Sequence, residues 1–161
     1  MLEYDFEQSI GHWLTMSTQS YHRAFQELIA PFGITYRQAQ VLGWLALEDE
    51  MSQTQLAARM MIEPPTLAGI LDRMERSGWI VRRVCRDDRR RKWICAGPEA
   101  EPVWEKIAEC GHRIRARATR GMTDDEVRQL KRLLGQVARN VSDEEAATIP
   151  ADTALGRQDR H

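Results

Sequence analysis

Two short helical patterns lie close together in the middle of the chain, and this pairing limits the folds open to it. Residues 52–55, Ser-Gln-Thr-Gln, have the capping-box form that begins a helix, and Gly78 offers a left-handed end to the second pattern. The apolar residues at helical spacing are Leu56, Ala57 and Met60, then Leu67, Ile70, Leu71 and Met74. Residues 61–63 form a tight connection between them, so the sequence predicts a helix-turn-helix.

The spacing of apolar residues changes directly after Gly78. Residues 79–85 and 92–95 are rich in β-branched and aromatic side chains, and they flank a polar, arginine-rich loop. This pattern predicts a β-hairpin, and a hairpin after a helix-turn-helix makes a winged helix. If the hairpin turns near Arg89, Cys85 faces Trp93 and Cys95 faces Arg83.

Longer amphipathic helices are predicted on both sides of this unit. Apolar residues recur at steps of three and four through residues 3–30, 36–46, 98–121 and 123–141. Capping boxes begin the second and the last of these, at Thr35 and Thr123, and the acidic residues 48–50 predict a loop. The expected fold is therefore mainly α with a small β-hairpin wing.

Charge is unevenly distributed along the chain. Residues 72–92 hold nine cations and four anions, a net charge of +5, whereas the whole chain has a net charge of −1 and the remainder therefore −6. Most of these cations are arginines, whose planar guanidinium suits phosphates and base edges. A phosphate backbone responds to local charge, so this segment suits a nucleic-acid partner, but a charge run alone equally describes a solvated surface hairpin. The winged helix predicted around it favours double-stranded DNA.

Other function classes find little support in the sequence. The 161 residues contain no nucleotide-binding or nucleophile motif, and the four histidines show no metal-ligand spacing, so we expect no enzyme, cofactor or metal site. Three cysteines without a Cys-x-x-Cys pair fit a reducing cytoplasm. No apolar run is long enough to span a membrane, and residues 1–13 do not resemble a signal peptide.

Several segments resemble the MarR family of transcriptional regulators, and more narrowly its SlyA-like branch. Residues 34–42 resemble the family's L-T-x-x-Q-x-x-V-L helix, and residues 52–57 and 62–67 resemble the two halves of its helix-turn-helix. Residues 71–80 resemble L-D-x-L-E-x-x-G-L-I, and Asp88-Arg89-Arg90 matches the D-R-R signature of the wing. The resemblance covers roughly residues 10–141.

The chain departs from the family pattern at three places. Ala96-Gly97 stands where relatives often have Leu-Thr, and Gly69 occupies a position of the recognition helix that is often polar or basic. The first helix also lacks the cysteine that peroxide-sensing members use. Because glycine has no side chain to read a base edge, the operator sequence is not carried over from relatives.

The resemblance and the residue chemistry together define expected domains. Residues 1–33 and 98–146 form a helical dimerisation region, and residues 147–161 form a flexible tail. Residues 34–97 form a winged helix-turn-helix DNA-binding domain, with the helix-turn-helix at 53–76 and the wing at 79–96. A second copy would cover the apolar helices, and a two-fold dimer suits a palindromic operator.

DNA contacts are expected from the two short helices and the wing. The N-terminus of the first short helix offers backbone N–H groups to phosphates, and the start of the recognition helix lies nearest the bases. The predicted contact residues are Gln53, Thr54, Pro65, Thr66, Ala68, Arg73, Arg86, Arg89, Arg90 and Arg91. The resemblance implies that Asp88 and Arg90 pair to stiffen the wing, which leaves Arg89 or Arg91 for the minor groove.

Regulation in the family usually comes from small anionic aromatic effectors that reset the spacing of the two DNA-binding units. Candidate effector-pocket residues are Trp13, Met16, Tyr21, Arg37 and Trp44, although each also suits ordinary core or interface packing. The function expected from the resemblance is a dimeric repressor that such an effector releases from DNA.

Two alternatives use the same sequence differently. Cys85 and Cys95 lie on the two predicted wing strands, and Arg86 next to Cys85 would favour a thiolate, so a thiol-redox regulator is one alternative. The other is a helical protein-interaction module without DNA affinity.

Overall fold

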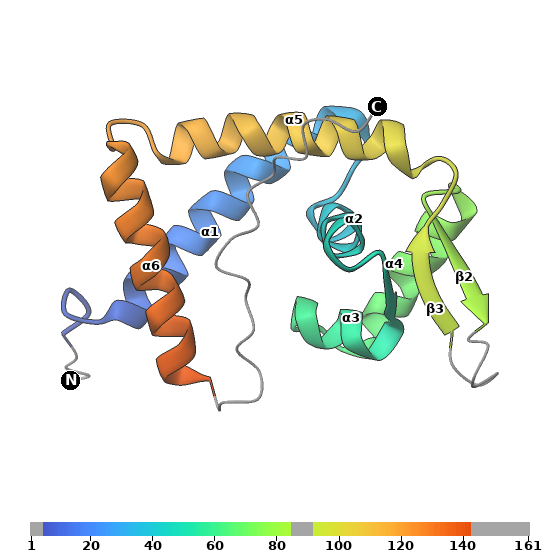
Figure 1. The fold of residues 1–161 in the computed structure, drawn as a ribbon, viewed down its shortest axis with the longest axis horizontal. Helices are drawn as coiled ribbons and strands as arrows, with labels where there is room; N and C mark the ends of the chain where they lie inside the picture. The colour runs from blue at the N-terminus through green and yellow to red at the C-terminus, as the bar shows by residue number, and fades with distance from the viewer. Residues whose placement is uncertain (1–4, 85–91, 143–161) are drawn as a thin grey trace. The chain divides into compact units, whose positions relative to one another are not determined.

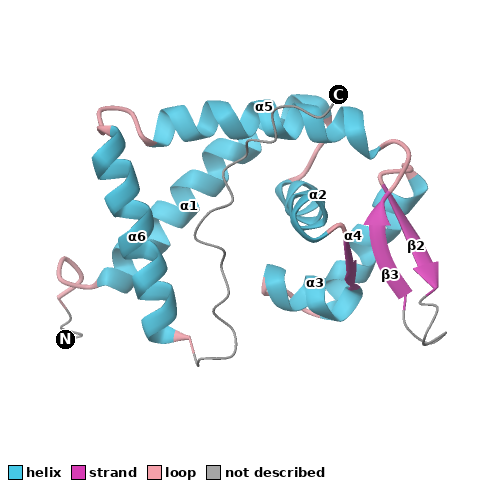
Figure 2. Cartoon of the chain, viewed as in Figure 1, coloured by secondary structure: helices cyan, strands magenta, loops and turns pink. Residues whose placement is uncertain are grey.

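The protein forms helices and a small sheet in the order shown in Figures 1 and 2, which present a computed structural model that describes residues 5–84 and 92–142. The helices are α1 (Ile10–Ile29), a 3-10 turn (Ala30–Phe32), α2 (Tyr36–Glu48), α3 (Gln53–Met60), α4 (Pro64–Arg76), α5 (Ala100–Ala118) and α6 (Asp124–Val141). The strands are β1 (Glu50–Ser52), β2 (Ile80–Val84) and β3 (Lys92–Ala96). The expected fold class is confirmed: the chain is mainly helical, with a hairpin after two short helices.

The chain divides into two compact units. The first, Met1–Ala118, contains α1 to α5 and the sheet, and the second, Thr119–His161, contains α6. None of the helices in the described parts of the chain is long and apolar enough to cross a membrane.

Side-chain caps begin the helices where the sequence predicts them. The Thr35 hydroxyl accepts a hydrogen bond from the Gln38 backbone N–H, and the Gln38 side chain accepts one from the Thr35 N–H at 2.9 Å. The boxes at Ser52–Gln55 and Thr123–Glu126 have the same reciprocal bonds. These caps satisfy N–H groups that have no partner inside the helix, so α2, α3 and α6 begin at defined residues.

Two of the long helices are shorter than predicted. The first begins at Ile10 rather than residue 3, because the Ser9 hydroxyl caps it by accepting from the His12 N–H at 3.2 Å. Phe6 fits the apolar spacing but lies in a turn that Asp5 closes by accepting from the Gln8 N–H. The helix predicted to run to Gly121 ends at Ala118.

The loop predicted at residues 48–50 is confirmed only at Asp49. Glu48 still belongs to α2, Asp49 turns the chain with φ 58°, and Glu50 begins β1. In the described part of the chain the sheet has three antiparallel strands in the order β1-β3-β2, with Met51 opposite Ile94. One apolar residue in a three-residue strand gives no alternating pattern, and this strand ends at Ser52, which also caps α3.

The predicted register of the hairpin is also wrong, by two residues. Cys95 lies opposite Val81, not Arg83, and Arg83 lies opposite Trp93. The base of the hairpin fixes this register, because Ile80 and Ile94 are fully buried and the Gly97 N–H donates to the Trp79 carbonyl at 2.9 Å. A two-residue shift would keep each side chain on its face of the sheet, so the contacts at the base of the hairpin, and not the alternation of side chains, select this pairing.

The core of the first unit lies between the short helices, the sheet and α5. Leu56 of α3, Leu67 and Leu71 of α4 and Val41 of α2 are almost fully buried, and Ile80 and Ile94 join them from the sheet. Helix α5 packs along α1 and also touches α2, and it buries Ile107 and Cys110. This packing holds the two short helices against the sheet and leaves their outer faces in solvent.

Gly97 provides a test of the hairpin base. A Cβ at this position would lie 2.2 Å from the Gly78 carbonyl oxygen, which belongs to a backbone held by φ 72° at Gly78. We expect Gly97→Ala to lower the free energy of unfolding by at least about 2 kcal/mol, because the backbone must move to accept the methyl group. Urea unfolding measures the change.

Gly43→Ala is the matched control. A Cβ at Gly43, inside α2, meets no heavy atom within 4 Å, so this variant should gain roughly 0.5–1 kcal/mol from helix propensity. Equal stability of the Gly97→Ala protein and the wild type would contradict the close approach of the two glycines.

Candidate nucleic-acid interface

The turn between α3 and α4 sets the angle of the two short helices. Met61 adopts a left-handed conformation with φ 49°, and its N–H bonds the Ala58 carbonyl while the Ile62 N–H bonds that of Ala57. Glu63 is the N-cap of α4 but makes no side-chain cap, and the prolines at 64 and 65 need no N–H partner in the first turn. The predicted helix-turn-helix is thus present, with its connection at residues 61–63.

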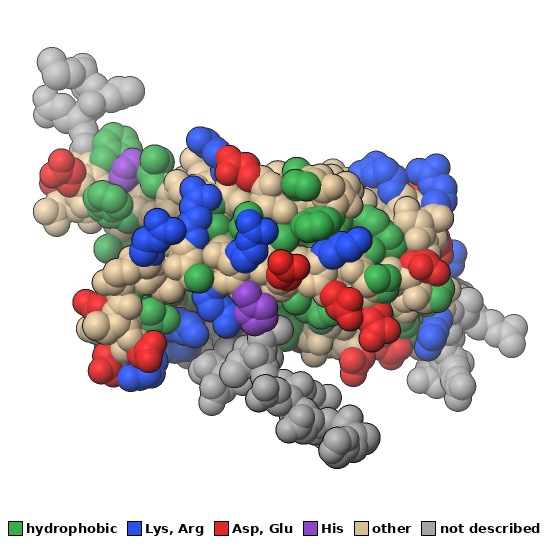
Figure 3. Space-filling model, turned by 90° about the horizontal axis from the view of Figure 1, so that it is seen from above, with side chains coloured by type: hydrophobic (Ala, Val, Ile, Leu, Met, Phe, Trp, Pro, Cys, Tyr) green, Lys and Arg blue, Asp and Glu red, His purple; other side chains and the backbone are tan. Residues whose placement is uncertain are grey.

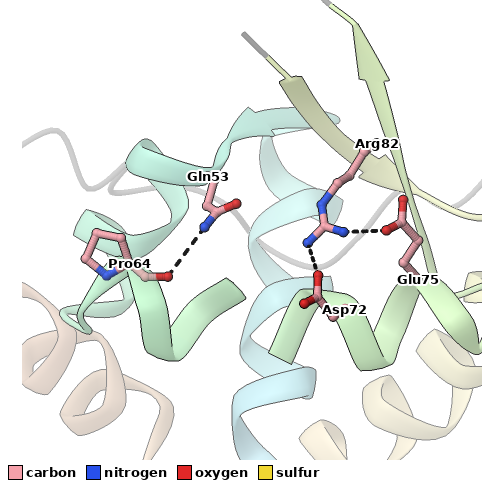
Figure 4. A network of polar contacts seen from close by, with 5 residues as sticks. All are labelled: Gln53, Pro64, Asp72, Glu75 and Arg82. Carbon is pink, nitrogen blue, oxygen red and sulfur yellow. Dashed lines mark hydrogen bonds and ion pairs between the residues drawn. The ribbon is translucent and has the colours of Figure 1, made fainter. Parts of the chain in front are cut away.

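The first residue of α3 is tied to the first residue of α4. The Gln53 side-chain amide donates to the Pro64 carbonyl oxygen at 3.4 Å, as Figure 4 shows. Gln53 is half-buried and Thr54, beside it, is exposed. The structure therefore places Gln53, one of the two predicted phosphate contacts, at the start of α4.

Helix α4 has one buried and one exposed face. Leu67, Ile70, Leu71 and Met74 point into the core. Pro65, Gly69, Asp72 and Arg76 follow each other at steps of four, three and four, so they lie along the opposite face. Of the predicted base-proximal residues, Pro65, Thr66 and Arg73 are exposed and Ala68 is half-buried.

A three-residue ion-pair network joins α4 to the sheet (Figure 4). Arg82 of β2, whose side chain is 18% exposed, donates to Asp72 at 2.7 Å and also to Glu75. Burial opposes the charged form of Arg82, but its bonds to the two carboxylates raise its pKa above the ordinary value. One guanidinium thus pairs with two carboxylates of α4, lowers their combined charge from −2 to −1, and fixes the base of the hairpin against this helix.

The tip of the wing lies outside the described residues. Arg86, Arg89, Arg90 and Arg91, the predicted pair Asp88–Arg90, and Cys85 all belong to that segment. Below the tip, Arg83 of β2 and Lys92 of β3 are exposed and add positive charge to the hairpin.

The described cysteines do not favour a reactive thiol. Cys95 is buried in β3, where burial raises its pKa more than Arg83 lowers it, and Glu50 lies 3.8 Å from its sulfur. Cys110 is buried between α5 and α1, its pKa is raised by burial, and its thiol lies 3.4 Å from the Leu28 carbonyl oxygen. A raised pKa reduces the thiolate fraction, and the thiolate is the reactive form.

A polar cluster joins α1 to the start of α2. The Tyr36 hydroxyl lies 2.5 Å from His22 Nε2, and the two ring centroids are 4.2 Å apart. Burial, and then the nearby Arg37, lower the pKa of His22. Burial raises the pKa of Tyr36, and the nearby Arg37 lowers it by less. Burial also raises the pKa of Tyr21, and Arg115 of α5 lowers it by less. Two effector candidates, Tyr21 and Arg37, therefore lie around the His22–Tyr36 pair.

Arg37 also connects this cluster to the helix-turn-helix. Its guanidinium donates to the Met60 carbonyl at 3.3 Å, at the end of α3, and to the Gln40 side chain at 2.9 Å. Gln26 of α1 holds the same corner by accepting from the Tyr36 N–H at 2.7 Å. Arg37 therefore links the start of α2, which contacts α1 at Gln26 and His22, to the end of α3 just before the turn.

The other effector candidates lie elsewhere. Trp13, 56% exposed, donates from its ring nitrogen to the Glu7 carbonyl, and Met16 is exposed on the same half of α1. Trp44 of α2 is half-buried, and the Arg59 guanidinium lies 5.2 Å from the centre of its ring. The structure does not place these three residues in contact with the His22–Tyr36 pair.

Sequence reasoning missed the residues that organise the site. Arg82 was counted in the charged segment, but its role was not predicted, although Asp72 and Glu75 precede it at steps of ten and seven. His22, Gln26 and Tyr36 had no signal beyond their positions on two predicted helices, because their contacts depend on how α1 and α2 cross.

Two short helices with a hairpin behind them define a winged helix, a class of DNA-binding proteins. The comparisons agree, since residues 32–91 match the model of the MarR family. A mutant MarR from E. coli complexed with operator DNA is 25% identical, covers 84% of this chain and 99% of its own, and has a TM-score of 0.73. The chain is thus similar to MarR regulators over residues 32–91 and shares their winged helix fold.

Two further solved structures share the fold. A MarR family transcriptional regulator from Rhodococcus sp. RHA1 has 24% identity and a TM-score of 0.76, and covers 88% of this chain and all of its own. BpsR from Bordetella bronchiseptica, whose DNA binding is regulated by 6-hydroxynicotinic acid, has 21% identity, a TM-score of 0.75 and the same coverage.

Removal of the Arg82 guanidinium should affect both stability and DNA binding. We expect Arg82→Gln to lower the free energy of unfolding by about 1 kcal/mol, a small value because Asp72 and Glu75 remain solvated. DNA affinity should fall as well, since the local charge changes from −1 to −2 and two unpaired carboxylates then repel phosphates. Urea unfolding and fluorescence anisotropy with duplex DNA measure the two effects.

Two further variants distinguish the loss of a positive charge from the loss of the ion pairs that Arg82 makes. Arg83→Gln removes the same charge from the same strand without breaking the network, so it should leave stability nearly unchanged. Adding Asp72→Asn and Glu75→Gln to Arg82→Gln should recover DNA affinity. A triple variant that binds as weakly as Arg82→Gln alone would show that neutralisation is not the role of Arg82.

His22 should make stability depend on pH. Its pKa in the folded chain lies below the ordinary value of 6.5, so between these two values the unfolded chain binds the proton first. Stability is therefore full above about pH 6.5 and decreases as the pH falls towards the folded-state pKa. Urea unfolding at pH 7.5 and 5.0 should show a smaller acid loss in His22→Gln than in the wild type. His112→Gln, an exposed position on α5, should behave like the wild type, and an equal acid loss in all three proteins would exclude His22 as the cause.

Proposed function

We propose that the chain is a homodimeric repressor that binds a palindromic operator and leaves it when a small aromatic acid binds. The observation that carries this proposal is an outward, cation-bearing face on α4 in a protein that also exposes long apolar stripes on α1 and α6. The first feature suits DNA, and the second requires a partner. A two-fold pair of identical chains supplies both.

The apolar stripes argue for a second copy. Within α6, all of which is described, no side chain is buried, and Leu130, Leu133 and Leu134 are each more than 40% exposed. The first half of α1 similarly exposes Ile10 and Trp13, and Figure 3 shows hydrophobic side chains at the surface of the face it displays. Each 100 Å² of such surface costs about 2.5 kcal/mol in water, so burial against another copy is strongly favoured.

Symmetry then defines the DNA site. A two-fold dimer presents two α4 helices, and these fit successive major grooves when they are about 34–36 Å apart. Residues Pro65, Thr66, Ala68 and Arg73 face the bases, and Gln53 and Thr54 contact phosphates. Beyond the described residues, Arg86, Arg89, Arg90 and Arg91 of the wing reach the flanking minor grooves. The motifs at residues 71–80 and 88–90 resemble MarR family patterns, and we propose the SlyA-like branch of that family for the chain.

The polar cluster at α1 and α2 supports an aromatic acid as the effector. A carboxylate attracts Arg37, and an aromatic ring suits the surroundings of Tyr21 and Tyr36. Arg37 drawn towards an acid releases the Met60 carbonyl at the end of α3, and the helix-turn-helix loses a constraint. The effector thereby favours a dimer whose α4 spacing does not fit DNA, by no more than its difference in affinity for the two states. BpsR, which shares this fold, responds to such an acid.

The setting that fits this function is the cytoplasm, where operator DNA is accessible and the buried cysteines stay reduced. A thiol-redox mechanism has less support, because burial raises the pKa of Cys95.

Selection from a random duplex library tests the function as a whole. The purified chain should enrich a palindrome at physiological salt, and a panel of aromatic acids such as salicylate should weaken that binding. Enrichment of no duplex would contradict a DNA-binding role and favour an interaction module. Enrichment of an asymmetric single site would contradict the symmetric dimer.

A substitution in the α6 stripe tests the dimer directly. Leu134→Lys places a charge in the apolar stripe, so we expect sedimentation to show monomers and the affinity for the palindrome to fall at least tenfold. Gln136→Lys adds the same charge on the polar face of α6 and should remain dimeric. A dimeric Leu134→Lys protein with wild-type affinity would remove α6 from the interface.

A further inference from the structure

The centre of the outward face of α4 lacks a side chain. Gly69 stands between Pro65 and Asp72 on this face, and Ala68 beside it is small. A Cβ built at Gly69 would meet one atom within 4 Å outside its own helix backbone, Nη1 of Arg73 at 3.9 Å. The guanidinium of Arg73 therefore lies over the space that a side chain at position 69 would fill.

The direction of Arg73 follows from helix geometry. Side chains in an α-helix lean towards the N-terminus, so a residue covers the position one turn before its own. Arg73 is four residues after Gly69, and its tip is thus carried back towards the first turns of α4. Those turns are the part of a recognition helix that contacts base edges.

The carboxylates next to Arg73 do not capture it. Asp72 and Glu75 both bind Arg82, and among residues 5–84 and 92–142 no carboxylate pairs with Arg73. Arg73 is exposed as well, so its five donors are available to a ligand. A free guanidinium therefore lies next to Gly69, beside the outward face of α4.

We propose that Arg73 reads a guanine in each half of the operator, through the space that Gly69 leaves open. The guanidinium fork matches the O6 and N7 acceptors that guanine presents in the major groove. This inference rests on the proposed function and adds to it the base class and the residue that selects it. A contact to phosphate is the competing role for Arg73, and it makes a different prediction, because phosphates carry no sequence information.

The first experiment compares base preferences. Affinities of the wild type, Arg73→Ala and Arg73→Lys are measured on the selected operator and on duplexes with each base pair of a half-site replaced in turn. We expect the wild type to lose about fivefold to 150-fold when one G·C pair per half-site is replaced, the range for a bidentate arginine–guanine contact. Arg73→Ala should lose that preference and keep those at other positions. Arg76→Ala, which removes the other exposed arginine of this face, should weaken all duplexes to a similar degree.

The second experiment identifies the atom that is read. Replacement of that guanine by 7-deazaguanine removes N7 and keeps the Watson–Crick pair. The substitution should weaken wild-type binding and have little effect on Arg73→Ala, so the two losses are not additive. Gly69→Leu fills the space under the guanidinium and should reduce the preference for the G·C pair. Arg73→Lys should reduce the same preference, and it does so without a change in helix packing.

The outcomes separate this inference from the proposed function. An operator whose base preferences are the same for the wild type and Arg73→Ala, with uniformly weaker binding, would overturn the guanine contact and leave the DNA-binding role intact. Additive losses from 7-deazaguanine and Arg73→Ala would overturn it as well. A wild-type chain that selects no operator would instead refute the proposed function on which the inference rests.

Discussion

Burial of one face of α4 is the constraint on which the rest of the structure depends. Leu67, Leu71 and Met74 are fully enclosed, and each such side chain contributes roughly 1.5–3 kcal/mol relative to exposure. Once these residues are inside, the helical period determines which residues point outward, and Arg73 and Thr66 are among them. Ile80 and Ile94 of the hairpin are buried in the same core, so the hairpin is fixed against α4. The reading face is therefore a consequence of packing.

Electrostatics then decides what this face can bind. A net charge near zero would by itself argue against DNA, but the excess of positive charge lies in residues 72–92, from the last residues of α4 through the hairpin. Arg82 pairs with both carboxylates of α4 and offsets one of their two charges, so the exposed arginines of this helix meet less opposing charge when they act on phosphates and bases. A chain with the same composition and without this pairing would present Asp72 and Glu75 to the DNA backbone as repulsive charges.

The sequence predicted the features that depend on neighbours along the chain. The three capping boxes, the turn at residues 61–63 and the hairpin after Gly78 are local, and the structure confirms them. The hairpin register and β1 were missed because they depend on contacts between distant segments, such as Met51 with Ile94 and Gly97 with Gly78. The His22–Tyr36 pair is of the same kind, since two unremarkable helical positions meet only when α1 and α2 cross. The wing contacts and the effector pocket stay predictions.

The central claim is that two copies of α4 read one face of a DNA duplex. Dimethyl sulfate protection on the selected operator tests it most directly, because this reagent methylates guanine N7 in the major groove. We expect two protected clusters whose centres lie about 10 base pairs apart, one helical turn on the same face of the duplex. A single protected cluster, or unprotected guanines on a duplex that the protein binds tightly, would contradict the account.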